Sequence, residues 1–164
     1  MNRRQLLTVL SGLAFTKTAL AATQSTTAAA PTLAVKPVKL SDAEWKKRLT
    51  PAQYDVLREH GTERPHSSPF NTEKRKGIYH CAGCDSPLFA SEMKFDSGTG
   101  WPSFFTSLPG ALGTSVDFKL VFPRTEYHCV RCEGHQGHVF NDGPAPTGKR
   151  YCNNGVALKF VSAV

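Results

Sequence analysis

Two stretches of the sequence decide how this chain folds: His80-Cys81-Ala82-Gly83-Cys84 and His128-Cys129-Val130-Arg131-Cys132. In each stretch two residues separate the cysteines, so one tight turn can present both thiolates to the same metal ion. Four thiolates complete a closed tetrahedron, and the sequence therefore predicts one structural zinc ion held by Cys81, Cys84, Cys129 and Cys132. Because 44 residues separate the two pairs, the ion would join two distant hairpins.

Two other uses of these cysteines stay open at the level of sequence. An exported protein could pair them as two disulfides, and free C-x-x-C pairs could act as redox-active dithiols. The second use would make the chain a thiol–disulfide oxidoreductase. A third alternative keeps the zinc and assigns no chemistry, which gives a zinc-ribbon-type binding module.

The first 21 residues are typical of a signal peptide. Arg3 and Arg4 precede an apolar stretch that ends in small residues at Ala21. The arginine pair followed by Gln-Leu-Leu resembles a twin-arginine leader, with an ordinary secretory leader as the alternative. We therefore expect a periplasmic protein, and we expect no membrane anchor because no cysteine follows the predicted cleavage site. Twin-arginine export of a folded chain, as that resemblance implies, would let the thiolates bind metal before they meet oxidants.

Residues 22–39 are rich in Ala, Thr and Pro and predict a flexible spacer, which leaves residues 40–162 for one domain. A capping box at Ser41 predicts a short helix, and Thr50 with Pro51 begins a second helix that ends at Gly61. Short β-type runs follow at residues 77–80, 87–89, 115–122, 138–140 and 156–160. The pattern predicts a mainly β fold with short N-terminal helices.

The charge balance argues against a nucleic-acid partner. The formal charge is +7, but residues 1–21 contribute three basic residues and no acidic one, which leaves 17 basic against 13 acidic residues, or +4. Zinc bound to four thiolates would lower this to about +2. No long run of Lys or Arg occurs in the remainder.

The fifth cysteine, Cys152, stands alone and suits a different chemistry. Arg150 lies two positions away, on the same face of a strand, and could lower the pKa of the thiol. His135 and His138 could supply protons near neutral pH. A purely structural role for each residue also stays open. Cys152 could be an inert buried thiol, the histidines could be hydrogen-bonded core groups, and Trp101 could belong to the core.

Three separated motifs then carry a resemblance to a known family: Gly100-Trp101-Pro102-Ser103-Phe104, Arg131-Cys132-x-x-His135-x-Gly137-His138-Val139-Phe140, and Arg150-Tyr151-Cys152-x-Asn154. They resemble the peptide methionine-R-sulfoxide reductase B family from about Ser41 to Phe160. The resemblance implies two antiparallel β-sheets joined by a zinc ion on the side away from the active site. It also implies an oxidoreductase that acts on methionine-R-sulfoxide in oxidised proteins, and possibly on the free amino acid.

The same resemblance assigns roles to individual residues. Cys152 takes the position of the nucleophile, Trp101 that of the wall that meets the substrate methyl group, and His135, His138 and Asn154 those of residues that handle the sulfoxide oxygen. Arg150 and Phe140 complete the predicted substrate site. Reaction would leave a cysteine sulfenic acid at Cys152.

The chain departs from the family pattern in three places. Many relatives carry a second, resolving cysteine where Thr99 stands here, so we expect a thioredoxin-like protein or a small thiol to reduce the sulfenic acid directly. Gln136 stands where leucine is usual, and Gly155 where serine is usual. Both positions neighbour predicted site residues. We expect the chain to act as a monomer.

Overall fold

The computed structural model describes residues 36–163. The predicted leader, 1–21, and the spacer up to residue 35 lie outside the described residues. No helix in the described range is long and apolar enough to cross a membrane.

The two short helices begin where the sequence predicted. Helix α1 (Asp42–Arg48) has Ser41 as its N-cap, and α2 (Pro51–Glu59) has Thr50. At α2 the capping box is reciprocal, because Gln53 donates its amide to the Thr50 hydroxyl while its side chain accepts from the Thr50 amide. The predicted end was wrong by one position: His60, with φ 56°, adopts the left-handed conformation expected of Gly61.

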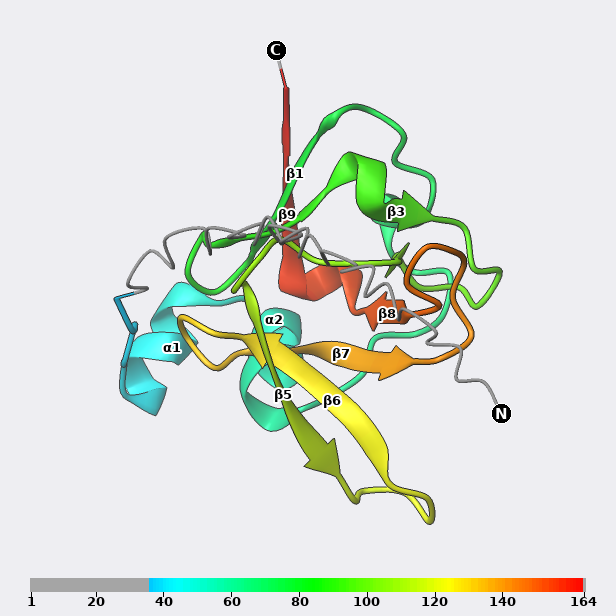
Figure 1. Cartoon of the computed structure of the whole chain (residues 1–164). Coiled ribbons are helices and arrows are strands. Elements are labelled where there is room, and N and C mark those ends of the chain that lie inside the picture. The colour runs from blue at the N-terminus through cyan, green and yellow to red at the C-terminus, as the bar shows by residue number, and fades with distance from the viewer. Residues whose placement is uncertain (1–35, 164) are drawn as a thin grey trace, which may run out of the picture. The chain divides into compact units, whose positions relative to one another are not determined.

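Two antiparallel sheets follow the helices, which confirms the predicted fold class (Figure 1). The smaller sheet has the order β2-β1-β9, and its strands are β1 (Gly77–Cys81), β2 (Pro87–Ala90) and β9 (Leu158–Ser162). The larger has the order β3-β4-β8-β7-β6-β5, with β3 (Lys94–Phe95), β4 (Ser103–Phe104), β5 (Leu112–Asp117), β6 (Arg124–Cys129), β7 (His135–Phe140) and β8 (Arg150–Asn153). Single turns of 3-10 helix occur at η1 (Pro69–Asn71), η2 (Ser91–Met93) and η3 (Gly155–Ala157).

The strand predictions differ from the structure in two instructive places. The run 115–122 was predicted as one strand, but β5 ends at Asp117 and the next strand begins at Arg124. The apolar residues between them form the exposed tip of the β5–β6 hairpin. Strand β8 carries Cys152 and is not among the predicted β-type runs, although the placement of Arg150 and Cys152 on one strand face assumed a strand there. Its sequence, Arg-Tyr-Cys-Asn, lacks the β-branched alternation that identifies a strand.

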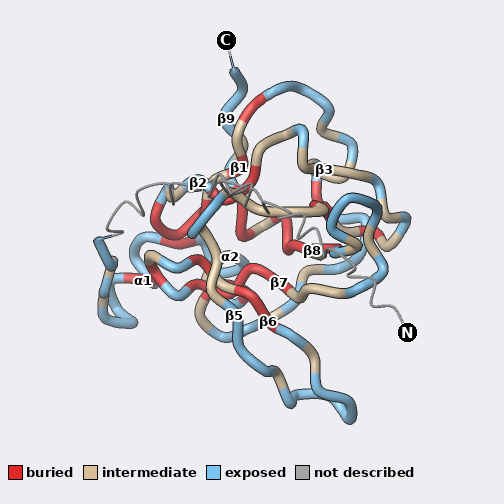
Figure 2. Tube along the Cα trace, viewed as in Figure 1, coloured by how far each residue is buried: buried red, intermediate tan, exposed pale blue. Residues whose placement is uncertain are grey.

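Aromatic side chains from both sheets form the contact between them. Tyr79 of β1 meets Phe104 of β4 edge to face, with 5.0 Å between ring centroids. Phe89 of β2 stacks on Phe104 at 4.0 Å and touches Tyr127 of β6 with its edge. All four rings are fully buried, and Figure 2 shows buried segments along the strands that carry them. Burial of these rings therefore fixes one sheet against the other.

Tyr79 and Tyr127 offer a matched pair for a stability test. The Tyr127 hydroxyl donates to Asn153 Oδ1 at 2.8 Å, whereas the Tyr79 hydroxyl has no hydrogen-bond partner within residues 36–163. Tyr127→Phe leaves a buried acceptor unpaired, so we expect a loss of about 1–2 kcal/mol in the free energy of unfolding. Tyr79→Phe should leave stability unchanged or slightly raised. Urea unfolding of both variants measures this, and equal losses would contradict the assignment.

Candidate functional site

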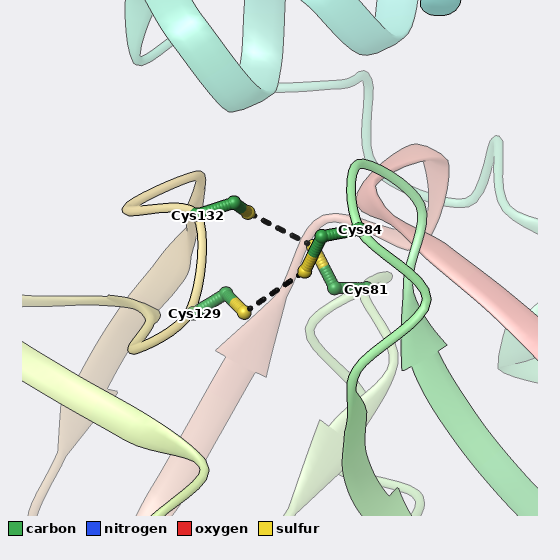
Figure 3. A group of neighbouring side chains, drawn as sticks. All are labelled: Cys81, Cys84, Cys129 and Cys132. Atoms are coloured by element: carbon green, nitrogen blue, oxygen red, sulfur yellow. Dashed lines mark hydrogen bonds between the residues drawn. The ribbon is translucent and has the colours of Figure 1, made fainter. Parts of the chain in front are cut away.

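The four paired cysteines meet at one point (Figure 3). Cys81 ends β1 and Cys84 lies in the turn that leads to β2, while Cys129 ends β6 and Cys132 lies in the turn that leads to β7. Cys81 Sγ lies 3.6 Å from Cys132 Sγ, and Cys84 Sγ lies 3.5 Å from Cys129 Sγ. The close contacts thus run between the two turns and join the small sheet to the large one.

This cluster has the dimensions of a metal site. All four sulfurs lie within 4.8 Å of one another and all four residues are buried. A tetrahedral ion with metal–sulfur bonds of about 2.3 Å places its ligands about 3.8 Å apart, close to the observed separations. The separations are too long for disulfides, and all five cysteines are free. The four buried cysteines can therefore hold one metal ion, as the spacing predicted.

Gln136, one of the departures from the family pattern, faces this cluster. Its side chain is fully buried, and Nε2 lies 3.4 Å from Cys81 Sγ and from the Gly134 carbonyl oxygen. An amide N–H directed at a metal-binding sulfur stabilises the thiolate form. The glutamine therefore contacts the cysteine cluster with its side chain.

Cys152 lies on β8 with a strand on either side. It is opposite Ser103 of β4 and opposite His138 of β7. A pocket of about 130 Å³ opens beside it. Five predicted site residues line this pocket: Trp101, His138, Phe140, Cys152 and Asn154. Four other residues complete the lining: Thr62, Arg124, Gly137 and Asn153. The structure thus brings together predicted site residues that lie up to 53 positions apart in the sequence, from Trp101 to Asn154.

The surroundings of Cys152 modify its acidity in opposing directions. Burial raises the pKa of the thiol, while the positive charge of Arg150 and the hydroxyl of Thr99 lower it. The net result is a pKa above the ordinary value. The expected influence of Arg150 therefore has the right sign, but desolvation outweighs it.

His138 is held by a carboxylate from the neighbouring hairpin. Its Nε2 lies 2.7 Å from Asp117 Oδ2, which also accepts from Arg124 at 2.6 Å. The amide of Lys119, with His138 and Arg124, holds the pKa of Asp117 well below its usual value. Burial lowers the pKa of His138, and the hydrogen bond to Asp117 opposes that effect. His138 thus lines the pocket with one nitrogen already bound to a permanent anion.

His135, the other predicted proton donor, does not line the pocket. It is buried, and Nδ1 lies 2.8 Å from Glu126 Oε1. Burial raises the pKa of Glu126, but hydrogen bonds from His135, His128 and Ser115 lower it to about 2. The His135 ring stacks on His60 and touches His138 with 5.3 Å between centroids. His135 therefore contacts the pocket through His138.

Arg150 also lies behind the pocket wall. It makes two hydrogen bonds of 2.8 Å to the carboxylate of Asp142, and its guanidinium lies 4.3 Å from the centroid of the Phe140 ring. Bidentate pairing and ring stacking fix the guanidinium in one orientation. Arg150 thus holds Phe140 in the pocket wall and acts on Cys152 through its charge.

Glu63 connects two predicted site residues, although nothing in the sequence pattern selected it. Its amide donates to Asn154 Oδ1 at 3.0 Å, and its carbonyl accepts from Trp101 Nε1 at 3.1 Å. Its carboxylate accepts from the amides of Gly155 and Val156. A Cβ atom on Gly155 would overlap the Ser68 hydroxyl, so this packing explains glycine at that position.

The sequence missed four carboxylates that position the site: Glu63, Asp117, Glu126 and Asp142. Each pairs with a residue far away in the sequence or across a strand, so spacing alone could not reveal it. Glu126 offered one signal, because it stands between Thr125 and Tyr127 in a strand and a buried charge there needs a partner.

A larger cavity of about 470 Å³ lies beside α2, η1 and η3. Glu63 and Ser68 are among its polar lining residues, and it contains no cysteine or histidine. It therefore lacks the nucleophile and the proton donor that the smaller pocket contains.

Comparison with known proteins agrees with the three sequence motifs. Residues 49–162 match the SelR domain family. The chain is 54% identical over 124 residues to the peptide methionine sulfoxide reductase MsrB of Agrobacterium fabrum, which covers 75% of this chain and 92% of that protein. It is 53% identical to the protein of the same name in Methanosarcina barkeri over 129 residues, covering 78% and 91%. It is 52% identical to the mitochondrial methionine-R-sulfoxide reductase B2 of Rattus norvegicus over 132 residues, covering 75% of each.

These relatives are named as reductases, so the alternative of a binding module without chemistry is not favoured. The match spans both sheets and includes Trp101, the cysteine pairs and Cys152. The chain belongs to the peptide methionine-R-sulfoxide reductase family.

Proposed function

We propose that this chain reduces methionine-R-sulfoxide in oxidised proteins to methionine, with Cys152 as the nucleophile. The observation that carries the proposal is the position of Cys152, a thiol apart from the metal-binding cluster, in a pocket lined by Trp101 and His138. The names of the relatives support the substrate and the R configuration. We also propose a monomer as the active unit, because a single chain supplies the nucleophile, the His138 proton donor and the Trp101 wall.

The reaction transfers one oxygen atom from sulfur to sulfur. The Cys152 thiolate attacks the sulfoxide sulfur while a proton reaches the sulfoxide oxygen. The oxygen then leaves the methionine sulfur and ends on Cys152 as a sulfenic acid. The methionine sulfur gains two electrons and the cysteine sulfur loses two. In its protonated form, His138 binds Asp117 through one N–H and can donate the other to the oxygen.

Trp101 binds the substrate, and an external reductant converts the Cys152 sulfenic acid back to the thiol. The Trp101 indole, fixed by its bond to the Glu63 carbonyl, offers a flat apolar wall to the methyl group. A first external thiol converts the sulfenic acid to a mixed disulfide and water, and a second thiol releases the Cys152 thiol. We propose a thioredoxin-like protein as this reductant, because the other cysteines lie buried in the cluster.

We propose zinc as the metal of the cysteine cluster. Four thiolates in a tetrahedral arrangement are the preferred ligand set of structural Zn²⁺. With four protein ligands the ion would keep no open position, so it would stabilise the joined turns without taking part in the reaction.

Because Cys152 is proposed as the nucleophile and Cys132 as a metal ligand, their serine variants should differ in both activity and zinc content. Cys152→Ser should abolish single-turnover reduction of methionine-R-sulfoxide and keep one zinc per chain. Cys132→Ser should lose the zinc and unfold more readily, because one metal ligand is missing. Zinc content by elemental analysis and turnover of N-acetyl-methionine-R-sulfoxide measure both.

Thiol counting after one turnover completes this test. The wild-type chain should lose one thiol, at Cys152, because the cluster sulfurs are not available. Loss of two thiols would show that a disulfide forms and that a cluster cysteine takes part. Wild-type turnover in Cys152→Ser would refute the proposed nucleophile.

The raised pKa of Cys152 predicts a pH-dependent reactivity. Because only the thiolate reacts, the rate of alkylation by iodoacetamide should rise with pH and reach half its maximum above the pH of an ordinary thiol. Arg150→Met removes a charge that stabilises the thiolate, so its curve should shift to higher pH. Lys149→Met is the matched control, because Lys149 binds Asn141 and does not act on Cys152. A wild-type midpoint at or below that of a free thiol would contradict this account.

We further propose that the chain reaches the periplasm through the twin-arginine pathway, as the leader sequence suggests. Arg3→Lys with Arg4→Lys keeps the charge but should abolish export of the full chain, whereas Lys17→Arg should not change it. Cell fractionation and immunoblotting measure the location. Undiminished export of the double variant, or in cells without the twin-arginine translocase, would exclude this route.

A further inference from the structure

The apolar residues exposed on this protein are concentrated on one hairpin tip. Seven large hydrophobic residues are exposed within residues 36–163. Four of them lie in the tip, residues 118–122, and a fifth, Val116, lies near the end of β5. Phe118, Val121 and Phe122 are 75%, 93% and 79% exposed. The tip extends away from the body of the fold between β5 and β6 (Figure 1). An exposed apolar cluster of this kind marks a binding surface.

The base of this hairpin is part of the pocket that contains Cys152. Asp117 and Arg124 are the paired residues at the two ends of the tip, and Arg124 lines the pocket. Asp117 binds both Arg124 and His138. The apolar tip is therefore continuous with the pocket wall, only one residue beyond Asp117.

Lys119 ties the tip to the body of the protein. Its Nζ donates to the carbonyl oxygens of Glu59 and His60 at the end of α2, at 3.1 and 3.3 Å. Its amide donates to Asp117 Oδ1 at 2.8 Å. The polar residue of the tip is thus bound to the protein, and its apolar neighbours face outward.

The size of the pocket indicates what the tip can bind. About 130 Å³ accommodates one side chain, so the residues on either side of a methionine sulfoxide must lie outside the pocket. An extended chain advances about 3.3 Å per residue. The tip begins beside Asp117, which binds Arg124 of the pocket, so we expect the next few residues of the substrate to contact the tip. The side chains that the tip exposes are apolar, so they suit apolar flanking residues, which a protein exposes when it is unfolded.

We propose that the apolar tip, residues 118–122, binds the apolar residues that flank methionine sulfoxide in an unfolded segment of an oxidised protein. This inference rests on the proposed function and specifies its substrate class. The tip selects protein substrates by contacts outside the pocket, and a free or N-acetylated methionine sulfoxide is too short to make them.

The test compares three substrates on the full chain: N-acetyl-methionine-R-sulfoxide, a nine-residue peptide with leucine and valine around methionine-R-sulfoxide, and the same peptide with serine and glycine instead. The variant is Phe118→Ser/Val121→Ser/Phe122→Ser, and Val161→Ser, an exposed apolar residue on β9, is the control. We expect the wild type and the control to prefer the apolar peptide by about tenfold in kcat/KM, from burial of a few apolar side chains. The triple variant should lose this preference through a higher KM and keep its rate on the small substrate.

Each other result has a defined meaning. An unchanged preference in the triple variant, or none in the wild type, overturns the inference. So does a wild-type dimer in sedimentation that the triple variant loses, because a second copy would then cover the tip. Binding of the wild type, but not the variant, to phosphatidylglycerol vesicles would overturn it in favour of a lipid surface. Failure of the wild type to reduce the small substrate refutes the proposed function instead.

Discussion

The contact between two hairpin turns at four cysteine sulfurs is the constraint on which the rest of this structure depends. One turn closes β1 and β2 in the small sheet, and the other closes β6 and β7 in the large sheet. Strand β7 then carries His138 directly opposite Cys152 on β8. A connection at the β6–β7 turn therefore fixes the strand that forms one wall of the pocket. The sulfurs and the stacked aromatic rings join the same two sheets, so a metal ion held by the four cysteines would reinforce the packing of the core.

Around Cys152 the protein balances burial against charge. Desolvation raises the pKa of the Cys152 thiol, and the positive charge of Arg150 lowers it by a smaller amount. Asp142 and Phe140 hold the Arg150 guanidinium in position. His135 and His138 each bind a carboxylate, Glu126 and Asp117, whose pKa is held below its usual value. A buried charge without such a partner would be costly, which explains why the supporting carboxylates accompany the site residues.

Much of the local structure could be predicted from the sequence. The capping box at Ser41 and the N-cap Thr50 followed by Pro51 identified both helices, because a helix start depends on residues close together in the sequence. The cysteine pairs identified the metal site for the same reason. Strand β8 was not among the predicted β-type runs, since Tyr151 and Cys152 are placed by their pairing with β4 and β7 rather than by a strand pattern of their own. The run 115–122 was wrongly predicted as one strand, because the apolar residues at the hairpin tip have the sequence pattern of a buried strand.

By itself, the sequence determined the family, the two turns that gather the cysteines, and the singular position of Cys152. These properties depend on residues close together in the chain or on motifs that can be read directly. Only the tertiary structure decided which residues share the pocket: Trp101, His138 and Asn154 line it, while His135 and Arg150 act from behind its wall. It also decided that Gln136 faces the cysteine cluster. Such assignments depend on strand pairing and burial, which bring together atoms that no local sequence pattern relates.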